Sequence, residues 1–348
     1  MPRSLPAVLG DLGDPGAAAC VVRGGQVVEE AVTGYLDGER PWTPDTLTMT
    51  YSCAKPLTAL TVLTLVRDGV LGLDQRVTEL WPAYAAHGKD ATTVRHVLAH
   101  QAGLPAFPEE AREVPFDDYD ALVGLLADAT PVHVPGAACA EHALTYGHLC
   151  DQLVRLATGE DLATRFARLA DEQGWDLHLR VAPGDLARVA DPVAVEDGWP
   201  ARYRDDPRWG PAMTRPEGLL DPQVLGSDRW RTTPFPAVNL HASARGLATF
   251  YGHLMDGTVE TLLGPELHRD YIGAQVTGHD LLLDREVTWT LGFQIDGDDL
   301  GMGGAGGSGA WWSFGGQYAA AFVSRGLGTH DRGDAVYELL EKRYRSRP

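Results

Sequence analysis

The chain has 348 residues, of which 44% are hydrophobic and 22% are charged, a composition typical of a globular protein. This length exceeds what one ordinary core requires, so we expect two subdomains or one large mixed fold. The net charge is −19 and the pI is near 4.9. Because the sequence also lacks a basic stripe, nucleic acid and anionic membrane surfaces are poor candidates as partners.

The N-terminal stretch gives no sign of export. Residues 1–22 are interrupted by prolines and glycines and contain no continuous apolar core of the signal-peptide type. No window reaches the length of a membrane span. We therefore expect a cytoplasmic protein whose four cysteines, which lack metal-ligand spacing, are buried thiols. They are Cys20, Cys53, Cys139 and Cys150.

The first predicted elements are two strands and a helix. Apolar runs at residues 17–22 and 26–31 flank a glycine-containing turn and predict a β-hairpin. A loop at residues 34–44 leads to a helix that begins near Ser52. Apolar residues recur at helical spacing after Ser52, so we expect one face of this helix to be buried.

The middle of the chain is predicted to be helical and its end to return to strands. We interpret residues 183–236, which are rich in Pro, Asp and Arg, as long surface excursions. Residues 289–295 and 319–324 are predicted strands around a glycine-rich turn. Helices are predicted at residues 92–99, 116–129, 146–158, 161–172, 184–190, 241–255 and 333–345.

This order of elements predicts an α/β (α+β) fold. Strands at both ends of the chain, with helices between them, indicate one mainly antiparallel sheet flanked by helices and built from both termini. We assign residues 1–75 and 235–348 to one discontinuous domain that contains the sheet. Residues 76–234 form the predicted helical domain, which carries long loops.

The strongest chemical signal is the pair Ser52 and Lys55. Residues three apart share a helix face, so the lysine amine can reach the serine oxygen. A lysine among apolar residues has a lowered pKa and can act as the base that activates a serine. The helix start also favours the anionic oxygen that forms on attack. Ser52 is therefore the candidate nucleophile, although Ser-x-x-Lys also occurs by chance and Cys53 is a rival.

Tyr146 is the second candidate. It lies at the start of a predicted helix, where a phenol can hydrogen-bond across a cleft and relay a proton, but an ordinary half-buried tyrosine is the alternative. His148 could line the same cleft or lie on the surface. The nearby His133 and His142 have no spacing that indicates a metal, and we predict neither a metal nor a cofactor.

The third candidate is the glycine-rich run at residues 301–309. Such a run lets the backbone approach a ligand closely and exposes N–H groups, which makes Met302, Gly303 and Gly304 candidate substrate contacts. No Gly-Lys-Ser/Thr follows, so a phosphate-binding loop is excluded, and a flexible loop is the alternative. Trp311 and Trp312, just beyond, belong to the core or form one wall of a pocket.

Together these stretches resemble the serine β-lactamase-like family, which includes class C β-lactamases, DD-peptidases and family VIII carboxylesterases. Residues 52–55 match the nucleophile motif, and residues 93–105 match the helix and turn that follow it. Residues 146–148 stand where the family has Tyr-x-Asn, and residues 301–309 stand at its Lys-Thr-Gly or His-x-Gly strand. Residues 241–254 match a later helix.

The resemblance implies a fold and a set of roles. The fold is an α/β sandwich with an antiparallel sheet plus an all-helical domain, with the site in the cleft between them. Ser52 would form an acyl-enzyme, and Lys55 with Tyr146 would take its proton and hand it to the leaving group. The backbone N–H groups of Ser52 and Ala305 would form the oxyanion hole.

Two departures from the family pattern bear on the substrate. Met302 stands where the family usually has Lys or His, so a cation that would hold a substrate carboxylate is missing. His148 replaces Asn, which removes an amide able to hold an acylamide side chain. With the expected cytoplasmic location, these departures weigh against β-lactamase and DD-peptidase activity.

The leading hypothesis is a cofactor-free serine enzyme that acylates Ser52 and hydrolyses a neutral small-molecule ester. The alternative is a transacylase that passes the acyl group to an amine or alcohol in small-molecule biosynthesis. A non-catalytic binding protein is the hypothesis from a different class. The sequence leaves open the acyl donor and acceptor, the oligomeric state, and the roles of Cys53 and His148.

Overall fold

The largest sheet of the molecule has eight antiparallel strands. The structure, a computed structural model, describes residues 3–345. The strand order is β2-β1-β12-β11-β10-β9-β8-β7, and the neighbouring pairs are antiparallel. The prediction of an antiparallel sheet built from both ends of the chain is confirmed. The strands are β1 (Gly16–Arg23), β2 (Gln26–Gly34), β7 (Val276–Asp280), β8 (Arg285–Trp289), β9 (Gln294–Asp296), β10 (Asp299–Gly303), β11 (Gly309–Ser313) and β12 (Tyr318–Ser324).

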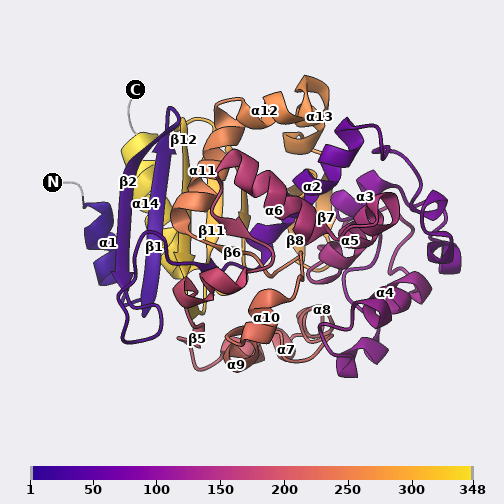
Figure 1. Cartoon of the computed structure of the whole chain (residues 1–348), viewed down its shortest axis with the longest axis horizontal. Helices are drawn as coiled ribbons and strands as arrows, with labels where there is room; N and C mark the ends of the chain where they lie inside the picture. The colour runs from indigo at the N-terminus through magenta and orange to yellow at the C-terminus, as the bar shows by residue number, and fades with distance from the viewer. Residues whose placement is uncertain (1–2, 346–348) are drawn as a thin grey trace.

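The N-terminal hairpin forms one edge of this sheet, as predicted. Its turn residues, Gly24 and Gly25, have φ angles of +58° and +72°, which glycine adopts at no steric cost and which match the twist of a two-residue hairpin. β1 also pairs with β12, where Ala17 lies opposite Ser324. In Figure 1 the indigo β1 and the yellow β12 accordingly lie side by side.

Helices cover both faces of the sheet. Consecutive side chains of a strand point to opposite faces, so Ala19 and Cys20 enter different cores. Ala19 packs in the core formed with α1 (Leu5–Asp11) and α14 (Asp331–Tyr344). Cys20 belongs to the larger core, on the face that α11 (Ala244–Met255) covers. Figure 1 shows α1 and α14 on one side of the sheet and α11 on the other.

The chain between the two groups of strands is mainly helical. α3 begins as predicted, because the Thr93 hydroxyl accepts a hydrogen bond from the His96 amide at 3.2 Å. The helices are α2 (Lys55–Arg67), α3 (Val94–Leu98), α4 (Tyr119–Asp128), α5 (Thr145–Thr158), α6 (Leu162–Gln173), α7 (Trp199–Arg204), α8 (Trp209–Met213), α9 (Pro222–Leu225), α10 (Asp228–Thr232), α12 (Thr258–Leu263) and α13 (Pro265–Ile272).

Short elements complete the chain. Two small sheets accompany the main sheet. In one, β6 pairs with both β3 and β4; in the other, β13 runs parallel to β5. The short strands are β3 (Thr48–Met49), β4 (Leu177–His178), β5 (Val193–Ala194), β6 (His241–Ala242) and β13 (Gly326–Leu327). The 3-10 turns are η1 (Ser52–Ala54), η2 (Val77–Glu79), η3 (Pro82–Gly88), η4 (Glu109–Glu113) and η5 (Pro183–Arg188).

α2 is buried all round, so the expectation of a single buried face is wrong. Every residue from Lys55 to Leu65 is buried, because α5, α6, α12 and α13 all contact this helix. Its threonines can be buried because their hydroxyls donate to carbonyl oxygens: Thr58 to Pro236 at 2.7 Å and Thr61 to Leu57 at 2.9 Å.

The interpretation of residues 183–236 as surface excursions with a short helix near residues 184–190 is right in part: η5 (Pro183–Arg188) is that helix and many residues of the segment are exposed. The segment is more structured than predicted. This segment contains α7 to α10, which are four to six residues long, too short for a helical period to show in the sequence. Trp199 and Trp230 anchor it in the core, where both are fully buried. Their indole N–H groups donate to Leu220 O at 2.9 Å and to Met49 Sδ at 3.0 Å.

The predicted strand at residues 289–295 is interrupted. β8 ends at Trp289 and β9 begins at Gln294, because Gly292, with a φ of +104°, turns the chain between them. Within residues 3–345, no helix is both long and apolar enough to cross a membrane. The cytoplasmic location and the two domain boundaries stay predictions.

Candidate active site

Ser52 sits at a strained position ahead of the central helix. It opens η1, which runs directly into α2. The preceding residue, Tyr51, has a φ of +47° and a ψ of −124°, a backbone conformation that non-glycine residues rarely adopt and that is often found at functional sites. The buried Tyr51 ring holds this conformation: its hydroxyl donates to Leu219 O at 3.1 Å and it packs against Trp199.

Lys55 points back at the serine, as the spacing predicts. Its Nζ lies 2.6 Å from Ser52 Oγ and 3.0 Å from Glu141 Oε1. The lysine side chain is 0% exposed and the glutamate side chain 6%. Burial lowers the pKa of Lys55 from its usual value, and the Glu141 carboxylate works in the opposite direction. The result is an amine that can hold or release a proton next to a serine hydroxyl.

Glu141 is placed by a second buried carboxylate. The Glu141 amide donates to Asp280 Oδ1 at 3.2 Å. The same oxygen accepts from the amides of Leu282 and Leu283, each at 2.9 Å, and the other oxygen accepts from Trp289 Nε1 at 2.9 Å. Asp280 therefore joins the segment before α5 to the turn between β7 and β8, and this junction carries Glu141 to Lys55.

The glycine-rich run approaches the nucleophile segment closely. Residues 301–303 belong to β10, and the loop that follows brings Gly304 against Thr50. A Cβ on Gly304 would lie 2.0 Å from Thr50 O, so only glycine fits at this contact. Cys53 Sγ donates to Met302 O at 3.3 Å, which ties η1 to β10. The loop is therefore packed against the serine segment and is not a free linker.

Ser52, Glu141 and this loop line one cavity of about 190 Å³. Its other walls come from α7, α8 and the β7–β8 hairpin, so the cavity joins segments from both halves of the chain. The lining is mixed: Tyr203, Trp209 and Met213 are aromatic or apolar, and Arg285 and His330 are the basic members. The lining residues are Ser52, Glu141, Ala143, Tyr203, Trp209, Met213, Leu283, Arg285, Gln294, Met302, Gly303, Gly304, Ala305 and His330.

Tyr146 does not reach this cavity, which corrects the prediction for it. The residue is fully buried at the start of α5, and its hydroxyl donates to Leu98 O at 3.2 Å. Its ring packs against His100, with 4.8 Å between ring centroids. Burial raises the pKa of Tyr146 well above its usual value, so a phenolate is strongly disfavoured there. Glu141, five residues earlier, occupies the place beside Lys55 that we expected Tyr146 to take.

His148 is likewise a core residue and not a substrate contact. Its ring lies among Phe107, Tyr119 and Phe235, with centroid distances of 5.3, 5.5 and 4.5 Å. Burial lowers the pKa of His148 to about 3, so the ring is neutral at physiological pH. It points into the interior because α5 turns this face toward the aromatic cluster.

The two tryptophans do not line the Ser52 cavity either. Trp311 lines an adjoining cavity of about 220 Å³, which shares Met302, Gly303 and His330 with the first. The next residue, Trp312, points to the opposite face of β11 and packs against Phe314 at 4.5 Å. In their place, Tyr203 and Trp209 supply the aromatic wall.

Sequence reasoning missed Glu141 and the residues of α7 and α8. One signal for Glu141 was available: it lies in the run Cys-Ala-Glu-His-Ala, and a carboxylate inside an apolar run needs a buried partner. Lys55, in an apolar helix, needs the same. No local signal marked Tyr203 or Trp209, because their helices are too short to be recognised.

Cys53, the rival nucleophile, is held as a thiol. Burial raises its pKa to about 12, and its hydrogen bond to Met302 O directs the sulfur away from the cavity that Ser52 lines. The four cysteines are free and buried, as predicted. Among the described residues, no cluster of three His, Cys, Asp or Glu side chains is arranged to hold a metal ion.

Known proteins resemble this chain along most of its length. The esterase/β-lactamase LipL of Mycobacterium tuberculosis is 32% identical over 267 residues, which are 70% of this chain but only 59% of LipL. A penicillin-binding protein homologue from Caulobacter crescentus superposes with a TM-score of 0.81 at 29% identity, covering 97% of this chain and 95% of its own. A family VIII carboxylesterase gives 0.83 at 25% identity, with 96% and 94% coverage.

The β-lactamase-like fold expected from the motifs is thereby confirmed. A protein-family model described as Beta-lactamase matches residues 5–342, a span that includes the sheet, the central helix with Ser52 and Lys55, and the glycine-rich loop. Along the chain, the Ser52 segment comes before the glycine-rich loop, which is also the order of the sequence motifs. The chain belongs to the β-lactamase family.

Proposed function

We propose that this chain is a serine ester hydrolase that forms an acyl-enzyme on Ser52. The observation that carries this proposal is the 2.6 Å contact between Ser52 Oγ and the fully buried Lys55 Nζ at the wall of a cavity. A nucleophile activated by an adjacent base, itself oriented by a third group, is the general arrangement of covalent acyl transfer. Here the third group is Glu141.

In the acylation step, the Ser52 oxygen attacks the ester carbonyl carbon while Lys55 takes the hydroxyl proton. Lys55 can accept it because burial favours the neutral amine. The tetrahedral intermediate then collapses with cleavage of the bond to the alkoxide. The leaving oxygen recovers a proton from the Lys55 ammonium or from Glu141, which lines the same cavity.

The Lys55–Glu141 pair can store that proton without building up net charge. Transfer of one proton from the ammonium to the carboxylate converts the charged pair into a neutral pair. Burial from solvent reduces the free-energy difference between these two forms. In deacylation, the neutral amine removes a proton from water, which attacks the acyl carbon. The bond between the acyl carbon and Ser52 Oγ then breaks, and the proton returns to the Ser52 oxygen.

The developing oxyanion needs hydrogen-bond donors. We assign this role to the backbone N–H groups of Ser52 and Ala305, which belong to two segments that line the cavity and that meet at the contact of Gly304 with Thr50. Removing one such donor typically costs about 2.7–4 kcal/mol of transition-state stabilisation.

The cavity suits an ester with an apolar part. That the ester is neutral stays a prediction, because the cationic Arg285 also lines the cavity. Tyr203, Trp209 and Met213 supply apolar surface, and Met302 offers a thioether at the third motif. Relatives named as an esterase and a carboxylesterase, at 32% and 25% identity, support ester hydrolysis. The partner of this reaction is a small-molecule acyl donor, and water is the proposed acceptor.

Intact-protein mass spectrometry tests the proposal. Wild type, Ser52→Ala and Cys53→Ala are mixed with p-nitrophenyl butyrate and quenched within one turnover. We expect an acyl adduct on wild type and Cys53→Ala and none on Ser52→Ala. An adduct that is lost in Cys53→Ala, or retained in Ser52→Ala, contradicts the assignment. A folded wild type that forms no adduct with any ester in a chain-length series favours the non-catalytic hypothesis.

The same adduct separates hydrolysis from transfer. A panel of amines and alcohols is added to the preformed acyl-enzyme, and the products are quantified against free acid. Hydrolysis predicts free acid as the main product at millimolar acceptor concentrations. Preferential formation of amide or ester would assign the chain to the transacylases instead.

A further inference from the structure

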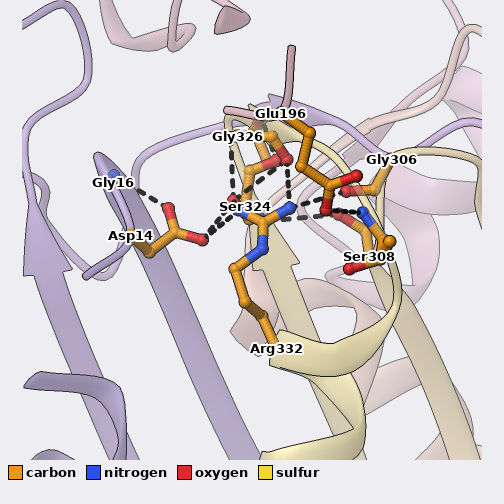
Figure 2. Close-up of polar contacts among 10 residues, drawn as sticks. Asp14, Gly16, Glu196, Gly306, Ser308, Ser324, Gly326 and Arg332 are labelled. Carbon is orange, nitrogen blue, oxygen red and sulfur yellow. Dashed lines mark hydrogen bonds and ion pairs between the residues drawn. The ribbon is translucent and has the colours of Figure 1, made fainter. Parts of the chain in front are cut away.

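A mostly buried arginine holds the loop between β10 and β11 from outside the cavity. Arg332 lies in the first turn of α14, and its Nη2 donates to Gly306 O at 3.1 Å and to Gly326 O at 2.8 Å. Figure 2 shows both contacts converging on the guanidinium. Gly306, with a φ of +96°, directly follows Ala305. Arg332 does not line the Ser52 cavity, so it does not touch a substrate bound there and acts through the residues that it holds.

A buried carboxylate fixes this arginine in place. The Asp14 side chain is 0% exposed and that of Arg332 is 12% exposed, and Arg332 Nη1 donates to Asp14 Oδ2 at 2.6 Å. Asp14 Oδ2 also accepts from Ser324 Oγ at 2.7 Å, and Oδ1 accepts from the Gly16 amide at 3.0 Å. As Figure 2 shows, Asp14 thus connects the start of β1, the end of β12 and the arginine.

The loop is fixed on the other side of Ala305 as well. The Gly304 amide donates to Ser308 O at 2.8 Å, and Gly304 abuts Thr50, two residues before the nucleophile. Ala305 is therefore held between the contact at Gly304 and the contact at Gly306. A displacement of Gly306 would be passed to the Ala305 peptide, because only one residue separates the two fixed points.

The chemistry of this network indicates a role beyond stabilising the folded state. A buried ion pair is often no more stabilising than apolar residues of the same volume, whereas a guanidinium that serves several acceptors fixes their relative positions through its planar fork. We propose that Arg332 is a positioning residue for acyl transfer. By holding Gly306 O it keeps the Ala305 N–H directed at the oxyanion, a role that rests on the function proposed above.

Single-turnover acylation of Arg332→Met tests this role. The substrates are p-nitrophenyl butyrate and the thionoester that carries C=S in place of C=O. Sulfur accepts hydrogen bonds weakly, so a misplaced oxyanion donor slows the ester more than the thionoester. We expect the ester rate to fall about 10- to 100-fold and the thionoester rate to change less than about threefold. Arg332→Lys, which keeps one cationic donor, should recover part of the loss.

Arg343→Met is the matched control. Arg343 lies near the other end of α14 and forms an ion pair with Glu29 of β2, so the variant also weakens the packing of α14 but leaves the loop untouched. It should lower the thermal midpoint and keep the wild-type ester-to-thionoester ratio. Asp14→Asn, which keeps the shape of the side chain but removes the carboxylate that holds Arg332, should lower the ester-to-thionoester ratio as well. It takes the place of Arg332→Met if that variant fails to fold.

The outcomes separate this proposal from the proposed function. If Arg332→Met and Asp14→Asn lower the thermal midpoint but keep the wild-type ester-to-thionoester ratio, Arg332 is a structural residue and the proposal is overturned, while the acyl-enzyme mechanism stands. If wild type forms no acyl-enzyme with any ester, the proposed function fails and the role of Arg332 fails with it.

Discussion

The pair Lys55–Glu141 and the pair His100–Tyr146 are both buried, but their titratable groups have opposite surroundings. In the first, the buried Lys55 is 3.0 Å from the Glu141 carboxylate, and the pair reaches a cavity through Ser52. In the second, His100 and Tyr146 pack ring against ring in the core. Burial lowers the pKa of His100 well below its usual value and raises that of Tyr146, so both groups stay neutral.

The comparison shows which buried titratable groups can take part in catalysis. Desolvation alone makes a titratable group neutral and inert, as it does for Tyr146. For Lys55, burial lowers the pKa while the Glu141 carboxylate opposes this shift, and Ser52 gives the pair access to a cavity. Tyr146 is the proton relay predicted from the sequence, but only Glu141 lies beside Lys55 and lines the cavity. The following predictions test this contrast.

The largest effect is expected for Lys55→Met. Loss of a positioned base should lower the acylation rate about 10²- to 10⁴-fold, and a buried Glu141 without its partner should lower the free energy of unfolding by about 3–5 kcal/mol. The double variant Lys55→Met/Glu141→Leu should recover most of the stability and none of the activity. Burst kinetics and urea denaturation measure the two quantities. Recovery of activity in the double variant would show that the pair has no catalytic part.

The next effect distinguishes Glu141 from Tyr146 directly. Glu141→Gln keeps the shape of the side chain and removes the carboxylate, and it should lower kcat/KM about 10²-fold. Tyr146→Phe removes one hydrogen bond to Leu98 O, so it should cost about 1 kcal/mol of stability and leave kcat/KM unchanged. Steady-state kinetics on purified variants decide. A large loss of activity in Tyr146→Phe at an intact fold would reverse the assignment of roles.

A smaller effect, with a defined direction, is expected on the pH dependence of kcat/KM. The neutral form of Lys55 acts as the base, so kcat/KM should rise with pH through the pKa of Lys55. The Glu141 carboxylate raises that pKa, and its removal in Glu141→Gln should therefore move the acidic limb of the profile to lower pH. Profiles of wild type and variant with one ester give the comparison. A shift to higher pH is the contrary result.

The smallest effect on activity is expected for His148→Phe, because His148 belongs to the aromatic core. Its pKa is about 3 in the folded protein and about 6.5 in an unfolded chain. The unfolded state therefore binds more protons between these values, and stability is lost as pH falls from 6.5 toward 3. The variant should reduce the slope of unfolding free energy against pH by about 1.4 kcal/mol per unit there. Urea denaturation from pH 4.5 to 7.5 measures the slope, and an unchanged slope contradicts the assignment.

Several features could be predicted from the sequence because they depend on residues close together in the chain. The contact of Lys55 with Ser52 follows from one turn of helix. The Gly24-Gly25 turn and the Thr93 cap likewise need only their immediate neighbours. The glycine-rich run marked a close backbone approach, and the structure places Gly304 against Thr50. For such signals, backbone geometry over three or four residues is the whole physical cause.

Only the tertiary structure decided which groups complete the site. Lys55 and Glu141 are 86 positions apart in the sequence, and Arg332 and Asp14 are 318 positions apart. No periodicity or motif in the sequence indicates contacts over such separations. These pairs form because the sheet takes strands from both ends of the chain and brings α2, the segment before α5 and α14 to fixed places around it. A local pattern cannot distinguish Tyr146 from Glu141, since the two lie five residues apart. The packing of α5 buries Tyr146 against His100, and the contact with Asp280 places Glu141 beside the lysine.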